Sequence, residues 1–278
     1  MKQDIKNFIT NAIKEDIGFQ DISSEACIKT DVTKKAKIIS KEDCIIAGID
    51  ITKKILNKID KKIKIKKSKK DGDEIKKQET IMIIEGPIKS ILKAERISLN
   101  IMQRMSGIAT KTNRIKKIIS KTNSKILDTR KTTPGFRMLE KKAVKIGGGE
   151  NHRFGLYDVI MIKENHIKAC GGIKKAIIKL SEYNKNKKYN VIIEVKNIDE
   201  LKEVLNYRNH VNRILLDNFD IIKTKQAIKI IKGKIKTESS GNIDENNILE
   251  YAKTGTNYIS LGCLTHSIKS IDLSLYII

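Results

Sequence analysis

The sequence predicts an α/β protein whose second half forms a barrel of parallel strands. Short apolar runs recur after residue 124, about 21 to 34 residues apart, and each is followed by a polar cluster. These intervals leave room for a crossover helix between successive strands, as in repeated β/α units. The first half instead mixes helical periodicity with Ile-rich runs separated by turn formers. Two differently organised halves are therefore expected.

The first half begins with an amphipathic helix. Apolar residues between positions 4 and 17 recur at helical spacing, opposite a face of Lys, Asp and Glu. Runs such as 36–39 and 81–84 lie between turn formers, which predicts strands with a helix or two between them. Alternating Ile and Lys in the stretch 61–70 favours a strand with a solvated face over a nucleic-acid site, because no aromatic residue is interleaved. Helical periodicity returns over residues 90–120.

The second half contains six apolar runs that we interpret as parallel strands. They lie at residues 126–127, 159–162, 191–193, 214–216, around 235, and 258–261, with polar clusters at 128–131, 163–166, 194, 217–218, 238–241 and 262–266. In a closed (β/α) barrel the C-terminal strand ends share one face, which holds the active site, so these clusters would line a single mouth. A doubly wound open sheet is the alternative, but such a sheet gathers its ligands at one switch point. Clusters after every strand favour the barrel.

The composition excludes several classes of protein. The chain has 278 residues and a formal charge of +24, which first suggests a nucleic-acid binder. Lysine outnumbers arginine by 49 to 8, however, so we interpret the charge as a drift of the whole composition rather than a binding patch. No apolar stretch is long enough to span a membrane and no signal-peptide core is present, so we expect a cytoplasmic protein without nucleic-acid or membrane partners. The four widely spaced cysteines exclude CxxC motifs and are expected to be reduced and mostly buried.

The arginines are unevenly distributed, with six of the eight between residues 96 and 153. Where lysine replaces most cations, a retained arginine indicates a need for its planar guanidinium, which binds carboxylates or phosphates through paired hydrogen bonds. A position on a helix surface is equally consistent for Arg104, Arg114 and Arg137. The cations expected to bind an anionic ligand are Arg96, Arg130, Lys131, His152, Arg153 and Lys163.

Two carboxylates, Glu194 and Asp217, end consecutive predicted strands in this cationic mouth. If these carboxylates faced the phosphates of a ligand, the negative charges would repel one another unless a cation lay between them. This suggests Mg²⁺ held partly by substrate oxygens. Alternatively, a carboxylate beside a ribosyl carbon would stabilise an oxocarbenium-like transition state. Either role indicates phosphoribosyl chemistry, whereas salt bridges to neighbouring lysines are the purely structural alternative.

Loops after the last two predicted strands contain the small residues typical of phosphate binding. These are Ser239 to Asn242 and residues 260–262, where glycine allows close approach of the backbone to phosphate. Residues 147–149 form a third glycine-rich stretch, but it lacks the strand-then-helix context of a nucleotide motif. We interpret it as a turn that positions residues 151–153.

Specific motifs now identify a family. Residues 128–135 (DTRKTTPG), 147–153 (GGGENHR) and 162–166 (IKENH) closely resemble the quinolinate phosphoribosyltransferases, also called carboxylating nicotinate-nucleotide pyrophosphorylases. Supporting stretches are 94–100 (AERISLN), 106–110 (SGIAT), 215–218 (LLDN), 238–241 (ESSG) and 260–267 (SLGCLTHS). Together they span nearly the whole chain.

The resemblance implies a type II phosphoribosyltransferase with two domains. An N-terminal α/β sandwich would comprise residues 1–107 and be joined by residues 270–278, and an open or incomplete α/β barrel would comprise residues 108–269. The implied reaction combines quinolinate with 5-phosphoribosyl 1-pyrophosphate and gives nicotinate mononucleotide, pyrophosphate and CO₂ in NAD synthesis. Mg²⁺ is the implied cofactor.

The motifs also imply roles for individual residues. Arg130, His152, Arg153 and Lys163 would hold the two carboxylates of quinolinate, and Arg96 would do so from the other subunit of a homodimer. Lys131 and Lys163 would contact the phosphoribosyl donor, Glu194 and Asp217 its ribose and Mg²⁺, and Ser240, Gly241 and Gly262 its phosphate. The implied catalytic residues are Lys131, Lys163, Glu194 and Asp217. The implied substrate-binding set also includes Thr129, Asn242, Leu261 and Cys263.

The chain departs from the family pattern at two points. Asn242 stands where the family usually has glycine; Asn tolerates a positive φ, but its side chain would lie near the phosphate. The stretch between Glu194 and Asp217 is about two residues longer than usual, around 206–211, and the motif after the strand identifies Glu194, not Lys196, as the family's counterpart. Two alternatives to quinolinate phosphoribosyltransferase activity stay open at this point. One is a homologous enzyme that uses another base, and the other is a basic nucleic-acid-binding protein.

Overall fold

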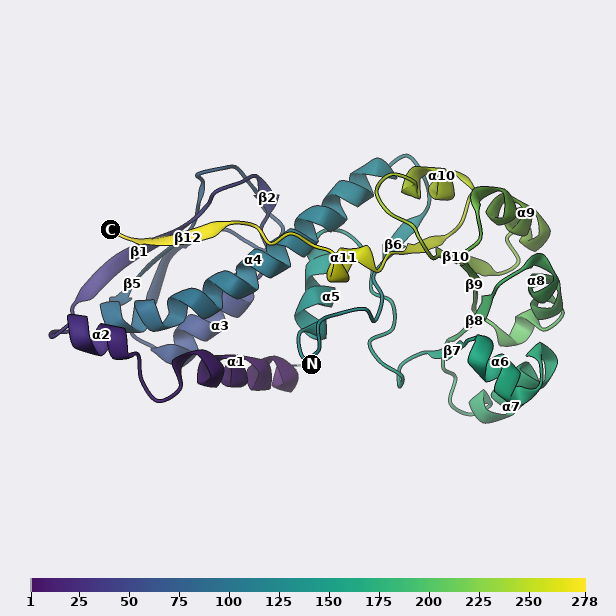
Figure 1. The fold of residues 1–278 in the computed structure, drawn as a ribbon, viewed down its shortest axis with the longest axis horizontal. Helices are drawn as coiled ribbons and strands as arrows, with labels where there is room; N and C mark the ends of the chain where they lie inside the picture. The colour runs from purple at the N-terminus through teal and green to yellow at the C-terminus, as the bar shows by residue number, and fades with distance from the viewer. Residues whose placement is uncertain (1) are drawn as a thin grey trace. The chain divides into compact units, whose positions relative to one another are not determined.

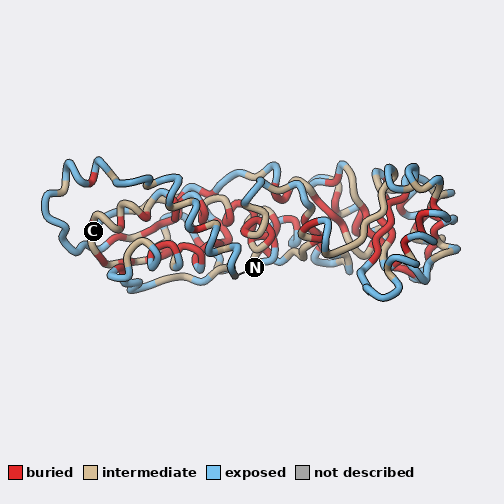
Figure 2. The backbone as a smooth tube through the Cα atoms, turned by 90° about the horizontal axis from the view of Figure 1, so that it is seen from below, coloured by how far each residue is buried: buried red, intermediate tan, exposed pale blue. Residues whose placement is uncertain are grey.

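The computed structural model describes residues 2–278, which divide into two compact units. The first unit comprises the residues up to 113 together with 132–148 and 267–278, and the second comprises 114–131 and 149–266. In Figure 2, buried segments run through the interior of each unit and exposed segments surround them. Each unit is described separately below.

The first unit contains an antiparallel sheet of four strands in the order β12-β1-β5-β3. Its strands are β1 (Thr33–Ser40), β3 (Lys64–Ser68), β5 (Thr80–Pro87) and β12 (Leu273–Ile277), and β2 (Cys44–Ile45) pairs separately with β4 (Glu74–Ile75). Its helices are α1 (Lys2–Ile17), α2 (Ile22–Cys27), α3 (Ile49–Ile59), α4 (Ile88–Ile118), which continues into the second unit, and α5 (Arg137–Ile146).

The core of the first unit lies between this sheet and the helices α3 and α4 (Figure 1). Alternate residues of β1, such as Ala36 and Ile38, point into it, as period-2 patterning requires. They meet Ile49 of α3 and Ile91 of α4. The expected strands and helices are therefore confirmed, including the lysine-rich strand, because four of the five residues of β3 are exposed.

The second unit contains a parallel sheet of six strands in the order β6-β11-β10-β9-β8-β7. The strands are β6 (Lys125–Leu127), β7 (Ile160–Ile162), β8 (Val191–Val195), β9 (Arg213–Asp217), β10 (Lys236–Ser240) and β11 (Tyr258–Ser260). Helices α6 (Glu164–Cys170), α7 (Ile173–Asn184), α8 (Ile198–Leu205), α9 (Ile221–Ile231), α10 (Ile248–Lys253) and α11 (Cys263–His266) and a 3₁₀ turn (Arg208–His210) connect them. Within the described residues β6 and β7 remain the two edges, so the predicted open barrel is confirmed.

The strands of this sheet are buried by the helices that connect them. Val191 and Ile193 of β8 pack with Ile214 of β9 and with Ile177 of α7 and Ala227 of α9. Figure 1 shows α7, α8 and α9 along one side of strands β7 to β10. This arrangement of β/α units brings the carboxyl ends of all six strands to one edge.

Three local expectations need correction. Glu194 lies within β8 rather than after it, and β10 begins after Ile235 instead of including it. Cys44 is buried, but Cys27 is exposed and Cys170 and Cys263 are half-buried, so the cysteines are not mostly buried. From residue 2 to residue 278, no helix is long and apolar enough to cross a membrane.

Candidate active site

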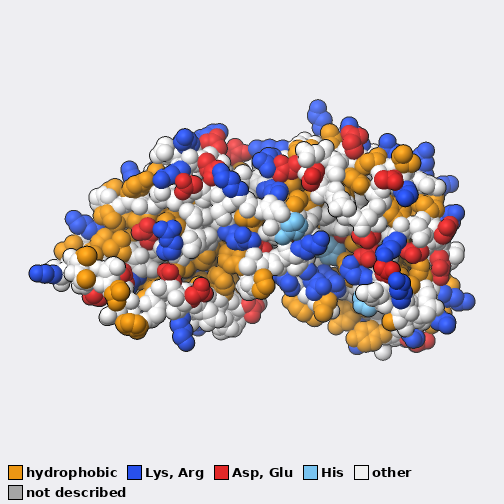
Figure 3. Space-filling model, in the orientation of Figure 1, with side chains coloured by type: hydrophobic (Ala, Val, Ile, Leu, Met, Phe, Trp, Pro, Cys, Tyr) orange, Lys and Arg blue, Asp and Glu red, His pale blue; other side chains and the backbone are white. Residues whose placement is uncertain are grey.

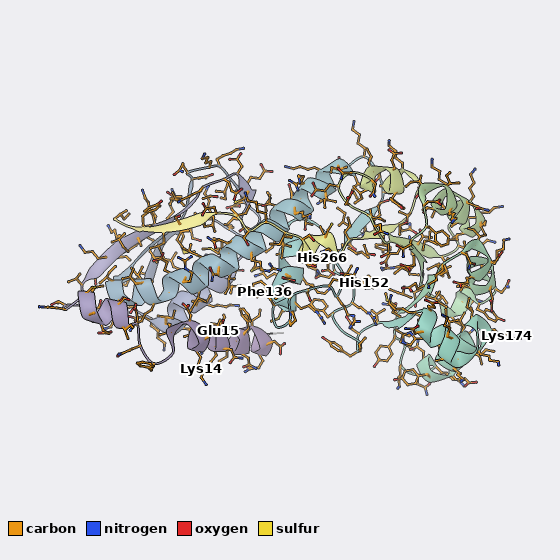
Figure 4. All side chains as sticks on the ribbon, in the orientation of Figure 1. Lys14, Glu15, Phe136, His152, Lys174 and His266 are labelled. Carbon is orange, nitrogen blue, oxygen red and sulfur yellow. The ribbon has the colours of Figure 1, made fainter. Side chains whose placement is uncertain are left out.

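A pocket of about 800 Å³ lies at the carboxyl ends of the parallel strands in the second unit. It brings together side chains that are far apart in the sequence, from the carboxyl ends of the six parallel strands and from the segment before β7. Figure 4 labels two of the lining residues, His152 and His266. The predicted site residues that line it are Thr129, Arg130, Lys131, His152, Arg153, Lys163, Glu194, Asp217, Ser240, Gly241, Asn242, Gly262 and Cys263.

The segment 151–153 is fixed to the end of β6 by Asp128. This carboxylate is fully buried and accepts hydrogen bonds from the backbone N–H of His152, at 2.8 Å, and from the side-chain amide of Asn151. Gly148, with a φ of 90°, provides the turn just before it, in a conformation that residues with a Cβ rarely adopt. The glycine-rich stretch 147–149 therefore leads into the segment that holds His152 and Arg153, as expected.

The ring of His152 is held on both sides. Its Nδ1 accepts a hydrogen bond from the backbone N–H of Arg153 at 2.7 Å, and its Nε2 lies 3.3 Å from Oε2 of Glu238. The same Glu238 oxygen accepts a 2.8 Å hydrogen bond from Arg213, whose guanidinium lies 3.9 Å from the centre of the Tyr258 ring. A network centred on the buried Glu238 therefore forms part of the pocket wall.

Two arginines contribute the positive charge expected of an anion pocket. Arg153 is buried, and desolvation, followed by the nearby positive charge of Arg130, lowers the pKa of its guanidinium. Its Nη1 donates a hydrogen bond of 3.4 Å to the backbone carbonyl of Val159. An anion placed between the two guanidinium groups would relieve their repulsion, because each group would gain an opposite charge.

The two predicted carboxylates lie in the same pocket as the lysines. Glu194 is buried and forms an ion pair with Lys163 at the end of β7, while Asp217 is the last residue of β9. Outside the pocket lining, Glu164 pairs with Lys168 at 2.7 Å and with Lys196. These two lysines, through hydrogen bonds first and charge second, hold the pKa of Glu164 at about 2.

The fit of this donor set to Mg²⁺ follows from its chemistry. Among residues 2–278 no cluster of three or more His, Cys, Asp or Glu side chains has the geometry to hold a metal ion. Mg²⁺ usually keeps several waters and takes one or two carboxylates together with substrate phosphates. Glu194 and Asp217 match that pattern, provided that a phosphorylated ligand supplies the remaining oxygens.

The loops after β10 and β11 contain pocket-lining glycines at positions where a side chain would collide with its neighbours. A Cβ on Gly241, where φ is 100°, would lie 2.1 Å from Oδ1 of Asn218, so only glycine fits there. Asn242 adopts a φ of 51°, as the sequence allowed, and its side-chain amide donates to Asn218 at 3.3 Å. A Cβ on Gly262 would lie 2.9 Å from Nε2 of His266.

Two predicted site residues do not line the pocket. Arg96 is exposed on α4 in the first unit, and Leu261 is buried behind β11, where its backbone N–H donates to Leu127. The three arginines for which a helix surface was equally consistent all pair elsewhere: Arg104 with buried Glu140, Arg114 with Glu245 and Arg137 with Thr132.

The pocket also contains residues to which the sequence gave no individual role. Glu238, Asn218 and His266 belong to the predicted polar clusters, but only their contacts distinguish them from neighbouring polar residues. The other additional lining residues are Met161, Leu215, Ile243, Asp244 and Ser260. On the face seen in Figure 3, Lys and Arg side chains are interspersed with Asp and Glu.

Comparison with known proteins agrees with this geometry. Residues 21–106 match the family model described as quinolinate phosphoribosyl transferase, N-terminal domain, and residues 108–276 match the corresponding C-terminal domain. The chain belongs to the quinolinate phosphoribosyltransferase family. The matched residues lie in both units of this quinolinate phosphoribosyltransferase, so the resemblance seen in the sequence is confirmed.

Relatives from distant organisms share most of their length with this family member. The chain is 42% identical to a probable nicotinate-nucleotide pyrophosphorylase [carboxylating] of Bacillus subtilis, covering 98% of this chain and 92% of the relative. It is 40% identical to the chloroplastic enzyme of that name from Arabidopsis thaliana, covering 99% and 83%. The solved nicotinate-nucleotide pyrophosphorylase of Francisella tularensis superposes with a TM-score of 0.94 at 40% identity, covering 100% of this chain and 97% of that one.

Proposed function

We propose that this protein transfers the phosphoribosyl group of 5-phosphoribosyl 1-pyrophosphate to quinolinate with decarboxylation, a reaction of NAD biosynthesis. One observation supports this function above the others. A single pocket, in a chain of this family, contains the two guanidinium groups of Arg130 and Arg153 together with the carboxylates Glu194 and Asp217. The arginines match the two adjacent carboxylates of quinolinate, and the acids match a ribose and a metal-bound donor.

The reaction divides into a transfer and a decarboxylation. The pyridine nitrogen forms a bond to the ribosyl carbon while the bond from that carbon to pyrophosphate breaks, and pyrophosphate leaves with the electron pair. The ring nitrogen is then cationic, so the adjacent carboxylate leaves as CO₂ and the electron pair remains on the ring carbon, which takes up a proton. The product is nicotinate mononucleotide.

The pocket residues assist mainly by positioning anions. Arg130, Arg153 and Lys163 hold the quinolinate carboxylates, and Lys131 and Lys163 hold the donor, so two mutually repulsive anions are brought into line. Glu194 stabilises positive charge that develops on the ribose. Ser240, Gly241 and Gly262 bind the donor phosphate. When bound, Mg²⁺ supplies positive charge to the pyrophosphate, with Glu194 and Asp217 as its protein ligands.

A homodimer completes the proposed site. Arg96 is exposed on α4 and, from the neighbouring subunit, binds a carboxylate of quinolinate. This assignment rests on the family motif that contains Arg96. It predicts that mixing inactive Arg96→Ala and Lys131→Ala chains restores activity, because a hybrid dimer regains one intact site; no recovery in confirmed hybrid dimers would contradict a shared site.

The function is tested with purified protein, Mg²⁺, the phosphoribosyl donor and quinolinate labelled in the carboxylate next to the ring nitrogen. Labelled CO₂ and nicotinate mononucleotide should form in equal amounts. Lys131→Ala should abolish both, whereas Lys174→Ala, on the outer side of α7 in Figure 4, should change neither. Activity on nicotinate but none on quinolinate would overturn the proposal.

A further inference from the structure

Glu238 is a fully buried carboxylate to which no reaction step above assigns a role. It lies in β10 and contacts two cations or proton donors from other elements, Arg213 at the start of β9 and His152 in the segment before β7. Both reach the same oxygen, Oε2, at 2.8 Å and 3.3 Å. One carboxylate therefore links three parts of the second unit.

Two neighbouring side chains favour the charged form of this carboxylate despite its burial. Desolvation has the largest effect and acts to raise the pKa, but the hydrogen-bonding contacts with His152 and Arg213, together with the charge of Arg213, outweigh it and hold the pKa of Glu238 below its ordinary value. The other oxygen, Oε1, is buried and has no hydrogen-bond partner within residues 2–278. A buried charge with one unsatisfied oxygen contributes little to stability, and an apolar side chain would often serve better.

The contacts of His152 determine which nitrogen holds its proton. Nδ1 accepts the N–H of Arg153 at 2.7 Å, and a nitrogen that accepts a hydrogen bond has no proton of its own. The ring proton is therefore on Nε2, where it faces Glu238. A carboxylate on one side of an imidazole commonly selects the tautomer in this way.

The same hydrogen bond fixes the backbone of Arg153. The guanidinium of this residue lines the pocket, and its Nη1 donates a long hydrogen bond of 3.4 Å to the backbone carbonyl of Val159. The direction of the side chain therefore depends on where its own backbone is held. A shift of about 1 Å in a substrate-positioning group can cost about 100-fold in rate.

We propose that Glu238 is a positioning residue: through the Nε2–H of His152 it fixes the backbone of Arg153, and thereby the direction from which this guanidinium meets a carboxylate of quinolinate. The inference deepens the proposed function and rests on it. His152 then acts on the substrate through Arg153. Arg213 balances the charge of Glu238, since its guanidinium is held against Tyr258.

The kinetic test uses Glu238→Gln, which preserves shape but removes the charge. We expect the KM for quinolinate to rise about tenfold, the size of a lost hydrogen bond to a charged group, while the KM for the phosphoribosyl donor stays within about twofold of the wild type. Glu250→Gln, an exposed glutamate on α10, is the matched control and should change neither KM. An unchanged KM for quinolinate, or an equal rise in the KM values of both substrates, would overturn the inference.

A second measurement needs no variant at Glu238. Nitrogen-15 NMR of labelled histidine distinguishes the two tautomers, and the four histidines can be assigned with single substitutions of His166, His210 and His266. The neutral imidazole of wild-type His152 should have its proton on Nε2 and none on Nδ1. The opposite tautomer would overturn the inference even if Glu238→Gln failed to fold. If the wild type formed no nicotinate mononucleotide, the proposed function would fail. If the wild type were active and Glu238→Gln had an unchanged KM for quinolinate, this inference alone would be contradicted.

Discussion

Lys163, at the end of β7, forms an ion pair with Glu194 in the neighbouring strand β8. Both residues line the pocket, and both are assigned to substrates in the proposed function. The ammonium group therefore occupies the position next to Glu194 where a divalent cation would bind. In the proposed function, the metal ion would therefore compete with Lys163 for the same carboxylate.

Replacing this lysine should strengthen metal binding while it destroys activity. In Lys163→Met, Glu194 loses its resident positive charge, so Mn²⁺ affinity in the absence of substrates should rise by up to about fivefold, equivalent to the ~1 kcal/mol of a partly exposed ion pair. Titration followed by electron paramagnetic resonance of free Mn²⁺ measures this directly. Lys168→Met is the control, because Lys168 pairs with Glu164 instead. Unchanged Mn²⁺ affinity in Lys163→Met would show that the two cations do not compete.

The loop after β10 should tolerate no side chain at Gly241. In Gly241→Ala the new Cβ would lie 2.1 Å from Asn218, so we expect the KM for the phosphoribosyl donor to rise at least about tenfold. Gly233→Ala separates this effect from backbone strain, since Gly233 also has a positive φ, of 71°, but no atom near the added Cβ. Both variants should lose about 1–3 kcal/mol of stability. Equal KM values for the two variants would place the donor phosphate elsewhere.

Asn242 should replace glycine at little cost to donor binding. Its φ of 51° lies in the left-handed region that Asn tolerates, and its amide is hydrogen-bonded to Asn218. Asn242→Gly should therefore change the KM for the donor by less than about threefold, whereas β-branched Asn242→Val, which strongly disfavours this region, should raise it well beyond that. Steady-state kinetics with varied donor compares the pair. A large gain in affinity for Asn242→Gly would show that the Asn side chain obstructs the phosphate.

The stability provided by Glu164 should depend on pH. Lys168 and Lys196 lower its pKa from 4.5 to about 2, so the folded protein holds the charge more strongly than the unfolded chain does. This contribution is fully present above pH 4.5 and is lost as the pH falls towards 2. The free energies of unfolding of Glu164→Gln and of the wild type, measured by denaturation, should thus differ at pH 7, and this difference should shrink below pH 4.5. A difference independent of pH would contradict the ion pairs.

The sequence predicted the pocket well where its residues follow apolar strands. Ile126 and Leu127, or Ile214 to Leu216, mark their strands by hydrophobicity, so the polar residues that follow them could be assigned to one edge of a parallel sheet. The arginine bias and the motifs then distinguished Arg130 and Arg153 from the many surface lysines. These choices depended on local sequence and on the geometry common to parallel sheets.

Other features depend on contacts that local sequence does not encode. The strand β10 reads KTESS, so its buried residues Thr237, Glu238 and Ser239 give no hydrophobic signal, and its start was placed too early. Glu238 matters because Arg213 and His152 reach it from other elements. Arg104 likewise pairs with a buried glutamate that lies 36 positions away. Such pairings become visible only once the elements are packed.

The strand β12 gives the first sheet an unusual order of assembly. Residues Leu273 to Ile277 pair antiparallel with β1, so Ala36 faces Ile277. During synthesis on a ribosome, the edge of β1 therefore gains this neighbour only after residues 273–277 have been made. An open strand edge is prone to pair with other chains while it is exposed. Premature termination before residue 273 would thus leave β1 with an unpaired, aggregation-prone edge, even though every residue that lines the pocket had already been translated.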